Sequence, residues 1–259
     1  MDKWNNVIGI DNIDMPIYRI FSRKYFRKML NDSRLALVHP EMWKDPFENI
    51  LMRSRLKNKN GTYTSLKTLR ETLFGQCWTA ESESDALWRV YSPDKGAIQV
   101  KTSVRKLFDA FWRSANPLAQ VSFFIGRVRY ITEKELISLL TRPDGFQKWL
   151  HDSTGRGRAE SLLFKRKAFS YEDEIRLIYQ YPSKKPIKST VYQFPFLPNN
   201  VLEEAVLDPR LTDEEAERTK QEIMSWGYMM PIRKSTLYTP QHFDIKFVLP
   251  KPKREKTAA

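Results

Sequence analysis

The chain has 259 residues, of which 41% are hydrophobic and 13% aromatic, and 44 Lys+Arg against 31 Asp+Glu give a formal net charge of +13. This composition excludes a collagen-like or broadly disordered chain and allows one substantial core or two small ones. The single cysteine, Cys77, excludes an intramolecular disulfide and a cysteine-based zinc cluster.

The first half of the chain mixes short strands and helices without a repeat. A turn at 42–49 and a polar loop at 57–61 interrupt the pattern. We expect Tyr25, Phe26, Met29 and Leu30 on the buried side of the first helix, and Gly75 at the end of the second. In chain order the patterns predict strands over 15–22, 34–40, 76–80 and 95–103, and helices over 22–33, 66–74, 81–91 and 104–114.

The second half predicts a strand pair or one bent strand over 121–132, with Gly126 as a bulge, and a mainly helical stretch over 133–169. A strand and turn follow at 202–210, and Thr212 with Glu215 predicts a capping box that opens a helix. Residues 232–250 are β-rich. Because strict βαβ alternation is missing, we expect an α+β fold with mixed or antiparallel sheets and flanking helices, as one domain over 1–250 with a disordered basic tail at 251–259.

The stretch "SYEDEIRLIYQY" (170–181) places three acids beside a strand-forming run. In an extended strand Glu172, Glu174 and Arg176 share one face. Two carboxylates on a half-buried face are costly unless a positive or hydrogen-bonding group meets them. Arg176 is one candidate for that partner, and a ligand is the other.

Common catalytic motifs are missing: the chain has no GxGxxG, P-loop, HExxH or GxSxG pattern. Arg19, in the first apolar strand, needs a carboxylate or a phosphate as partner. Trp78 precedes a helix whose aromatics, Trp88 and Tyr91, lie on roughly one side, and core packing accounts for that pattern.

Several segments together resemble the DUF2971 family, a bacterial domain of unknown function. Lys44–Glu48 stands where that family shows Asn-Asp-Pro-Phe-Glu, and Trp88, Tyr91 and Gly96 match its Trp-x-x-Tyr followed by Gly. The family's bacterial background suits a role in phage defence or toxicity. The matching stretches are "IYRI", "LALVHPEMWKDPFEN", "CWTAESESDALWRVYSPDKGAIQV", "GRVRYI", "FKRKAFSYEDEIRLI" and "LEEAVLDPRL".

The order of an early Arg, an aromatic strand before a Ser/Ala helix, and a late Glu-x-Glu also resembles the ADP-ribosyltransferase fold, a split β-sandwich. That resemblance implies NAD as substrate and nucleic acid, or a nucleic-acid-associated protein, as target. It implies Glu174 as the essential catalytic group and Glu172 as the residue that orients the acceptor. The residues that it implies for NAD binding are Arg19, Tyr18, Trp78 and Thr79.

Two other functions stay open on the sequence. The net charge and basic runs such as "FKRK" (164–167) favour a non-enzymatic module that binds RNA or DNA. A nuclease would use Asp45, Glu48, Glu172 and Glu174 around Mg²⁺, but a well-placed Glu-x-Lys pair is missing, and we expect no metal. Apolar runs stay short of the ~20 residues of a membrane span and the start has no signal-peptide core, so we expect a cytoplasmic protein without a membrane partner.

Overall fold

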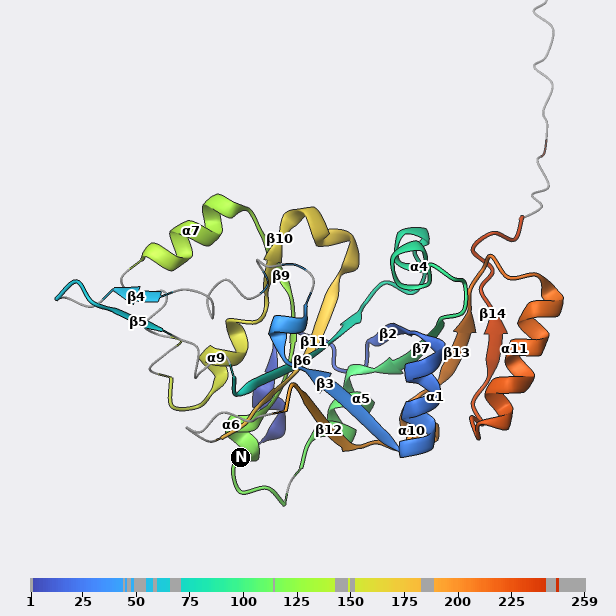
Figure 1. Ribbon diagram of the computed structural model, residues 1–259, viewed down its shortest axis with the longest axis horizontal. Coiled ribbons are helices and arrows are strands. Elements are labelled where there is room, and N and C mark those ends of the chain that lie inside the picture. The colour runs from blue at the N-terminus through green and yellow to red at the C-terminus, as the bar shows by residue number, and fades with distance from the viewer. Residues whose placement is uncertain are drawn as a thin grey trace, which may run out of the picture.

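A computed structural model describes residues 2–43, 45, 48, 55–57, 60–65, 71–113, 115–142, 149, 152–182, 189–240 and 246 (Figure 1). The helices are α1 (Arg23–Asp32), α4 (Asp85–Tyr91), α5 (Val104–Phe111), α6 (Ala119–Ser122), α7 (Glu133–Thr141), α9 (Arg156–Glu160), α10 (Pro198–Val201) and α11 (Asp213–Ser225), with 3-10 turns η1 (Lys3–Asn6), η2 (Pro40–Met42) and η4 (Lys167–Glu172). The strands are β1 (Val7–Ile8), β2 (Pro16–Phe21), β3 (Arg34–Val38), β4 (Arg55–Lys57), β5 (Tyr63–Ser65), β6 (Leu73–Thr79), β7 (Ile98–Ser103), β8 (Phe123–Arg127), β9 (Arg129–Ile131), β10 (Phe164–Arg166), β11 (Glu174–Gln180), β12 (Val191–Pro195), β13 (Glu204–Leu207) and β14 (Ile232–Lys234).

A mixed sheet of ten described strands runs across the molecule in the order β1-β8-β11-β6-β2-β7-β13-β14, with β3 and β12 branching from β6. The end pairs β1/β8 and β13/β14 are parallel, and the pairs between them are antiparallel. Two small sheets, β9/β10 and β4/β5, stand apart from it. The predicted α+β fold with flanking helices is therefore confirmed.

The core fills the space between this sheet and the helices α1, α5 and α11. Phe26 and Met29 of α1 and Leu107, Phe108 and Phe111 of α5 are buried in it. Full burial of such a side chain stabilises the fold by about 1.5–3 kcal/mol. These faces follow the apolar period of the sequence, except that Tyr25, expected on the buried side of α1, is 61% exposed.

The sheet opens between its two central strands. β2 pairs with β7 over six residues, but it meets β6 at the single pair Tyr18–Thr79. β6 instead pairs along its whole length with β11. The strands β2 and β6 therefore separate beyond that pair, and a cavity can form between them.

Some predicted elements are wrong, and packing explains two of the errors. The end predicted for the helix at 66–74 is wrong, because Leu73–Thr79 is strand β6 and Gly75 lies inside it, while residues 66–70 lie outside the described residues. A Cβ on Gly75 would lie 2.5 Å from Cζ2 of Trp43, so glycine here makes room for an indole. Gly126 is no bulge either, because its register in β8 is continuous and Leu163 fills the space above it.

In the later part of the chain the capping box of Thr212 and Glu215 opens α11 as predicted. The stretch 133–169, expected to be mainly helical, contains strand β10 after helix α9. No described helix is long and apolar enough to cross a membrane. The tail at 251–259 lies outside the described residues.

Candidate active site

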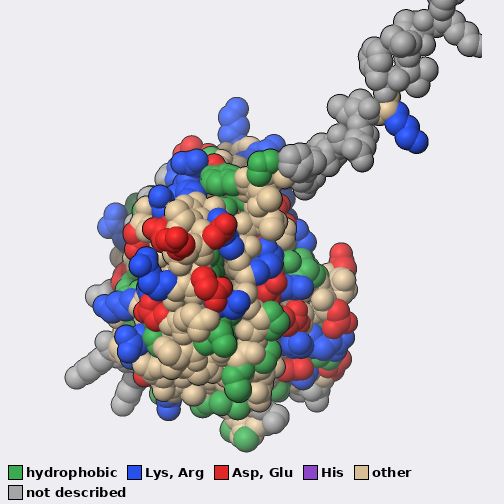
Figure 2. All heavy atoms as spheres, turned by 90° about the vertical axis from the view of Figure 1, so that its right-hand side faces the viewer, with side chains coloured by type: hydrophobic (Ala, Val, Ile, Leu, Met, Phe, Trp, Pro, Cys, Tyr) green, Lys and Arg blue, Asp and Glu red, His purple; other side chains and the backbone are tan. Residues whose placement is uncertain are grey.

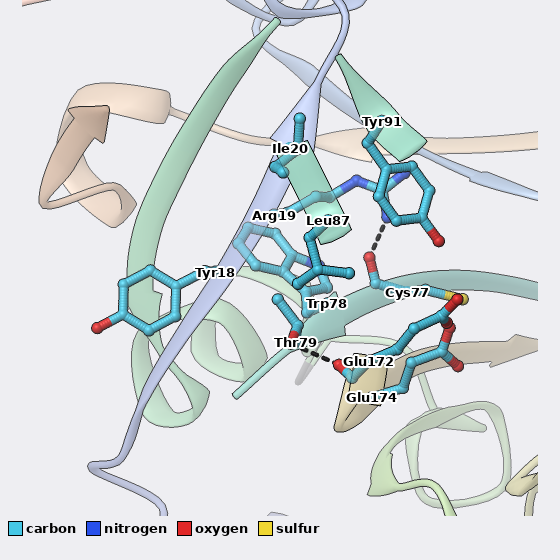
Figure 3. A pocket seen from close by; sticks show the side chains of 10 residues that line it. All are labelled: Tyr18, Arg19, Ile20, Cys77, Trp78, Thr79, Leu87, Tyr91, Glu172 and Glu174. Atoms are coloured by element: carbon cyan, nitrogen blue, oxygen red, sulfur yellow. Dashed lines mark hydrogen bonds between the residues drawn. The ribbon is translucent and has the colours of Figure 1, made fainter. Parts of the chain in front are cut away.

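Two adjoining cavities lie where β2 and β6 separate. The larger has a volume of about 420 Å³ and the smaller about 80 Å³. Both are lined by Arg19, Cys77, Tyr91, Glu172 and Glu174. The side chains come from β2, β6, α4, η4 and β11, so segments distant in sequence meet here (Figure 3). The six residues that the sequence proposed for catalysis and NAD binding all line the smaller cavity, namely Tyr18, Arg19, Trp78, Thr79, Glu172 and Glu174.

Arg19 bridges the gap between the separating strands. Its Nη1 donates a hydrogen bond to the carbonyl oxygen of Cys77, and its guanidinium lies over the Phe21 ring at 5.0 Å. Its Nε has no hydrogen-bond partner, and no carboxylate of the described residues lies within ion-pair distance of it. Burial lowers the pKa of Arg19, and the nearby acid Glu174 partly opposes that effect. The strand therefore holds a cation at the cavity without a paired anion among the described residues.

The three neighbouring acids separate at a sharp turn rather than along a strand. Glu172 ends the 3-10 turn η4, Asp173 adopts a left-handed conformation with φ 35°, and Glu174 begins β11. Asp173 then points elsewhere, toward Arg127, with the closest contact at 2.6 Å. Left-handed backbone suits an Asp better than most residues. As a result Glu172 and Glu174 reach the same side, as predicted, although the expected strand alternation is not the cause.

The backbone of this turn is fixed from two sides. The Thr79 hydroxyl donates to the carbonyl oxygen of Glu172 at 2.5 Å, and the Ala80 amide donates to that of Asp173 at 2.9 Å. The Glu174 amide donates to the Tyr130 hydroxyl at 2.9 Å. The end of β6 therefore positions the acidic pair, and the Thr79 hydroxyl is engaged in doing so.

Two buried cations hold the acids together. Lys165 Nζ lies 2.5 Å from Glu172, 3.0 Å from Glu174 and 2.7 Å from Glu48. Arg176 donates from Nη2 and Nε to Glu174 Oε2 at 2.5 and 2.8 Å, and it also lies 3.3 Å from Glu48. All five side chains are buried. We call these residues, Glu48, Lys165, Glu172, Glu174 and Arg176, the ion cluster.

Arg176 is fully buried because further groups complete its environment. Nη1 donates to the carbonyl oxygen of Leu162 at 2.6 Å, and the Trp43 ring stacks on the guanidinium at 4.4 Å. Gly75 leaves the space that this indole occupies. Of the two partners that the sequence left open for the acidic pair, Arg176 or a ligand, Arg176 pairs with Glu174. A guanidinium that is hydrogen-bonded along its edges and stacked on its face is well placed for such burial.

The pKa values of the two acids, Glu172 and Glu174, are shifted in opposite directions. Burial, together with the hydrogen bond with Glu174, raises the pKa of Glu172 to about 7. Burial alone would also raise the pKa of Glu174, but Arg176, Glu172 and Lys165 together lower it to about 2. Two carboxylates at one site do not ionise together easily. Near neutral pH, Glu174 is therefore ionised and Glu172 is close to half protonated.

The aromatic residues of the site divide between core and cavity. Trp78 is 2% exposed, its Nε1 donates to Gln76 at 2.9 Å, and its ring meets the edge of Phe21. Tyr18 points away from the acidic pair in Figure 3, whereas the Tyr91 ring lies beside Arg19. Tyr91 is 44% exposed and lines both cavities. The ring best placed to contact a ligand is therefore Tyr91, which the sequence favoured as a core residue.

Sequence reasoning missed Lys165 as a site residue and assigned it to a basic run. The run "FKRK" is not a free basic patch, because Lys165 is buried in the ion cluster and Arg166 pairs with Asp45 at 2.9 Å. On the face that carries α11 and β14, Lys and Arg side chains stand beside Asp and Glu (Figure 2). If 164–166 had been predicted as a strand, the alternation of side chains would have placed Lys165 on the opposite face from Phe164 and Arg166.

The acids proposed for a nuclease do not form a metal centre in the part of the chain that the structure describes. Within those residues no group of three or more His, Cys, Asp or Glu has the arrangement of a metal site. Asp45 lies against Arg166, and the other three acids surround Lys165. The acids are thus matched by fixed cations of the chain itself.

No protein-family model matches the chain, so membership of the DUF2971 family stays a prediction. No curated protein matches it either. Structures of DarT from Thermus sp. 2.9 are similar to it at 12% sequence identity. The complex with NAD+ covers 86% of this chain and 96% of that chain with a TM-score of 0.39, and the complex with carba-NAD+ covers 86% and 97% with 0.38. The complex with ADP-ribosylated ssDNA covers 88% and 96% with 0.40. At this level of similarity the likeness assigns no activity to this chain.

Proposed function

We propose that this protein is an NAD-dependent ADP-ribosyltransferase whose acceptor is a nucleic acid or a nucleic-acid-associated protein. The observation that carries the proposal is the pairing, in one cavity, of Arg19, a cation without a carboxylate partner among the described residues, with Glu174, a buried carboxylate of low pKa. NAD offers a diphosphate to the first and a ribose that becomes cationic to the second. The ligands named for the DarT structures are NAD+, which corresponds to the substrate proposed here, and ADP-ribosylated ssDNA, which corresponds to a modified nucleic-acid acceptor.

The reaction breaks the bond between ribose C1′ and the nicotinamide nitrogen, and the bonding electrons leave with nicotinamide. Positive charge develops on the ribose, and a fixed carboxylate stabilises that transition state. We assign this role to Glu174, which Arg176 and Lys165 hold in one orientation. Arg19 would bind the diphosphate through its guanidinium, because arginine suits phosphate geometry.

The second half of the reaction forms a bond between C1′ and an acceptor oxygen or nitrogen, which then loses a proton. We assign the removal of that proton to Glu172, which lines the same cavity. A general base works best when its pKa lies near the working pH. The pKa of Glu172, about 7, meets that condition.

The test measures nicotinamide release from NAD by the purified protein, with and without single-stranded DNA or RNA. Glu174→Gln should lower the rate by about 100-fold or more, because removal of one electrostatic stabiliser typically costs that much. Glu204→Gln is the matched control, since Glu204 also begins a strand and pairs with an arginine, Arg233, but lies outside both cavities. It should keep wild-type activity.

Folding and binding are measured on the same variants. Millimolar NAD should raise the melting temperature of wild type and of Glu174→Gln, and Arg19→Ala should lose that rise. If Glu174→Gln fails to fold, Glu174→Asp replaces it, since it keeps the charge but withdraws it from the cavity. Absence of both nicotinamide release and NAD stabilisation in wild type contradicts the proposal. Salt-sensitive nucleic-acid binding would then indicate a non-enzymatic module.

A further inference from the structure

A third cavity, of about 480 Å³, lies outside the candidate active site and is lined by three arginines. Arg127 ends β8, Arg129 begins β9 and Arg142 follows α7. Two aromatic side chains, Trp149 and Phe164, form part of the apolar wall. The elements concerned, α7, α9, β9 and β10, lie together in the left half of Figure 1. We call this cavity the arginine pocket.

The positive charge of the arginine pocket is only partly neutralised. Arg129 and Arg142 are exposed, and neither pairs with a carboxylate of the described residues. The acid among the lining residues, Glu160, pairs instead with Arg156 at 2.9 Å. Arg129 is held against the Phe164 ring at 5.2 Å, which restricts its side chain. Cations that are held close together without anions favour an anionic ligand.

The pocket is connected to the candidate active site through two structural links. Neighbouring side chains of β10 face in opposite directions, as in any strand, so Phe164 lines the arginine pocket while Lys165 enters the ion cluster. The third arginine, Arg127, makes two contacts from Nη2 to Asp173, at 2.6 and 2.7 Å. Asp173 is the turn residue that separates Glu172 from Glu174. A ligand that binds Arg127 would therefore compete with Asp173 for the same guanidinium.

We propose that the arginine pocket binds phosphate, either as a free polyphosphate or as the backbone of a nucleic-acid strand. Phosphate oxygens match the planar donors of guanidinium groups, and two such groups can bind one phosphate from both sides. Trp149 and Phe164 are buried and form an apolar wall beside these donors. This site is separate from the one proposed for NAD, and its binding does not depend on that activity.

Two substitutions make opposite changes in the pocket. The double variant Arg129→Gln/Arg142→Gln should weaken pyrophosphate binding at least 10-fold in calorimetry without NAD. Asp173→Asn should tighten it several-fold, because it releases Arg127, and asparagine tolerates the left-handed backbone of that position. The control Arg34→Gln/Arg218→Gln removes the same charge from exposed positions in β3 and α11 and should leave binding unchanged.

Arg19→Gln separates the two sites, because Arg19 lines only the other cavities. Pyrophosphate binding that survives Arg19→Gln and is lost in the Arg129/Arg142 variant supports the assignment. A ten-nucleotide single strand decides the source: loss of its binding in the same variant identifies backbone phosphate, and unchanged binding identifies free polyphosphate. Pyrophosphate binding that is absent, that follows Arg19, or that falls equally in the control variant overturns the proposal.

Discussion

Glu172→Gln tests the ion cluster directly, because glutamine copies the protonated acid. Its amide can donate to Glu174, and its carbonyl oxygen can accept from Lys165, which lies 2.5 Å from Glu172. In wild type the pKa of Glu172 rises from 4.5 to about 7 on folding, chiefly through burial. The folded chain therefore binds this proton more tightly than the unfolded chain. Stability from this group is fully present below about pH 4.5 and is lost as the pH rises through 7.

The size of this loss follows from the shift itself. One pKa unit corresponds to about 1.4 kcal/mol, so the full shift corresponds to about 3 kcal/mol once Glu172 is ionised in both states. Most of that change, about 2 kcal/mol or slightly more, falls between pH 5 and pH 8. Glu174 does not interfere, because its pKa is lowered to about 2 and its contribution is lost only as the pH falls below 4.5.

The assay is urea unfolding of wild type and Glu172→Gln at pH 5, 6, 7 and 8. The difference between the two free energies of unfolding should shift in favour of the variant by about 2 kcal/mol from pH 5 to pH 8. Subtraction removes the titration of other groups. Curves that stay parallel with pH, or a shift in favour of wild type, would refute the reasoning that burial keeps a proton on Glu172.

Three further predictions concern groups around the cavity. Lys165→Met should lower the free energy of unfolding by about 3–5 kcal/mol at pH 7 in a urea titration, since it leaves buried acids uncompensated. The control Lys101→Met removes a half-exposed partner of Glu203 and should lower that free energy by under about 1 kcal/mol. Gly75→Ala should cost about 1–3 kcal/mol because its Cβ meets the Trp43 ring; Gly96→Ala, with ordinary contacts, is the control, and equal values would contradict the packing role. Burial raises the pKa of Cys77 to about 12, so iodoacetamide at pH 8 should label the folded protein far more slowly than the urea-unfolded chain, as intact mass spectrometry would measure; equal rates would contradict it.

The sequence predicts well where a local pattern determines the structure. The apolar period of 104–114 predicts α5, and the Thr212–Glu215 spacing predicts α11, because both signals lie within one element. The helix end predicted at Gly75 is wrong because a glycine after a helical pattern resembles a helix terminator, whereas Gly75 lies inside strand β6. Its actual role depends on Trp43, more than thirty residues earlier, and such a contact leaves no periodic signal.

The candidate site shows the same difference between local patterns, which the sequence reveals, and contacts between distant residues, which it does not. The sequence selected Arg19, Glu172 and Glu174 by resemblance, and the fold brings these three to one cavity. It did not select Lys165, and it named Glu48 only as a nuclease acid, because the contacts of Lys165 with Glu48 and Glu174 join residues that are distant in the sequence. A lysine in a basic run is ordinarily a surface residue, and only tertiary packing shows that Lys165 is buried.

The charge of the ion cluster also determines the pH at which the proposed reaction can run. Three acids surround two cations, so with Glu48 and Glu174 ionised the cluster is neutral while Glu172 holds its proton and carries one net negative charge after losing it. A cationic ribose is stabilised best by the ionised form, and the acceptor proton can leave only to an ionised Glu172. We therefore expect kcat/KM for nicotinamide release to rise with pH through about 7 in wild type, and the rise to disappear in Glu172→Gln.

That pH range is also the range in which wild type loses stability. The form of the cluster that suits catalysis is thus the form that burial disfavours, which is a common feature of active sites. Glu172→Asp should restore a rising pH profile, because it restores a titrating acid. A flat wild-type profile, or a rise that persists in Glu172→Gln, would mean that Glu172 supports the fold and takes no part in the reaction.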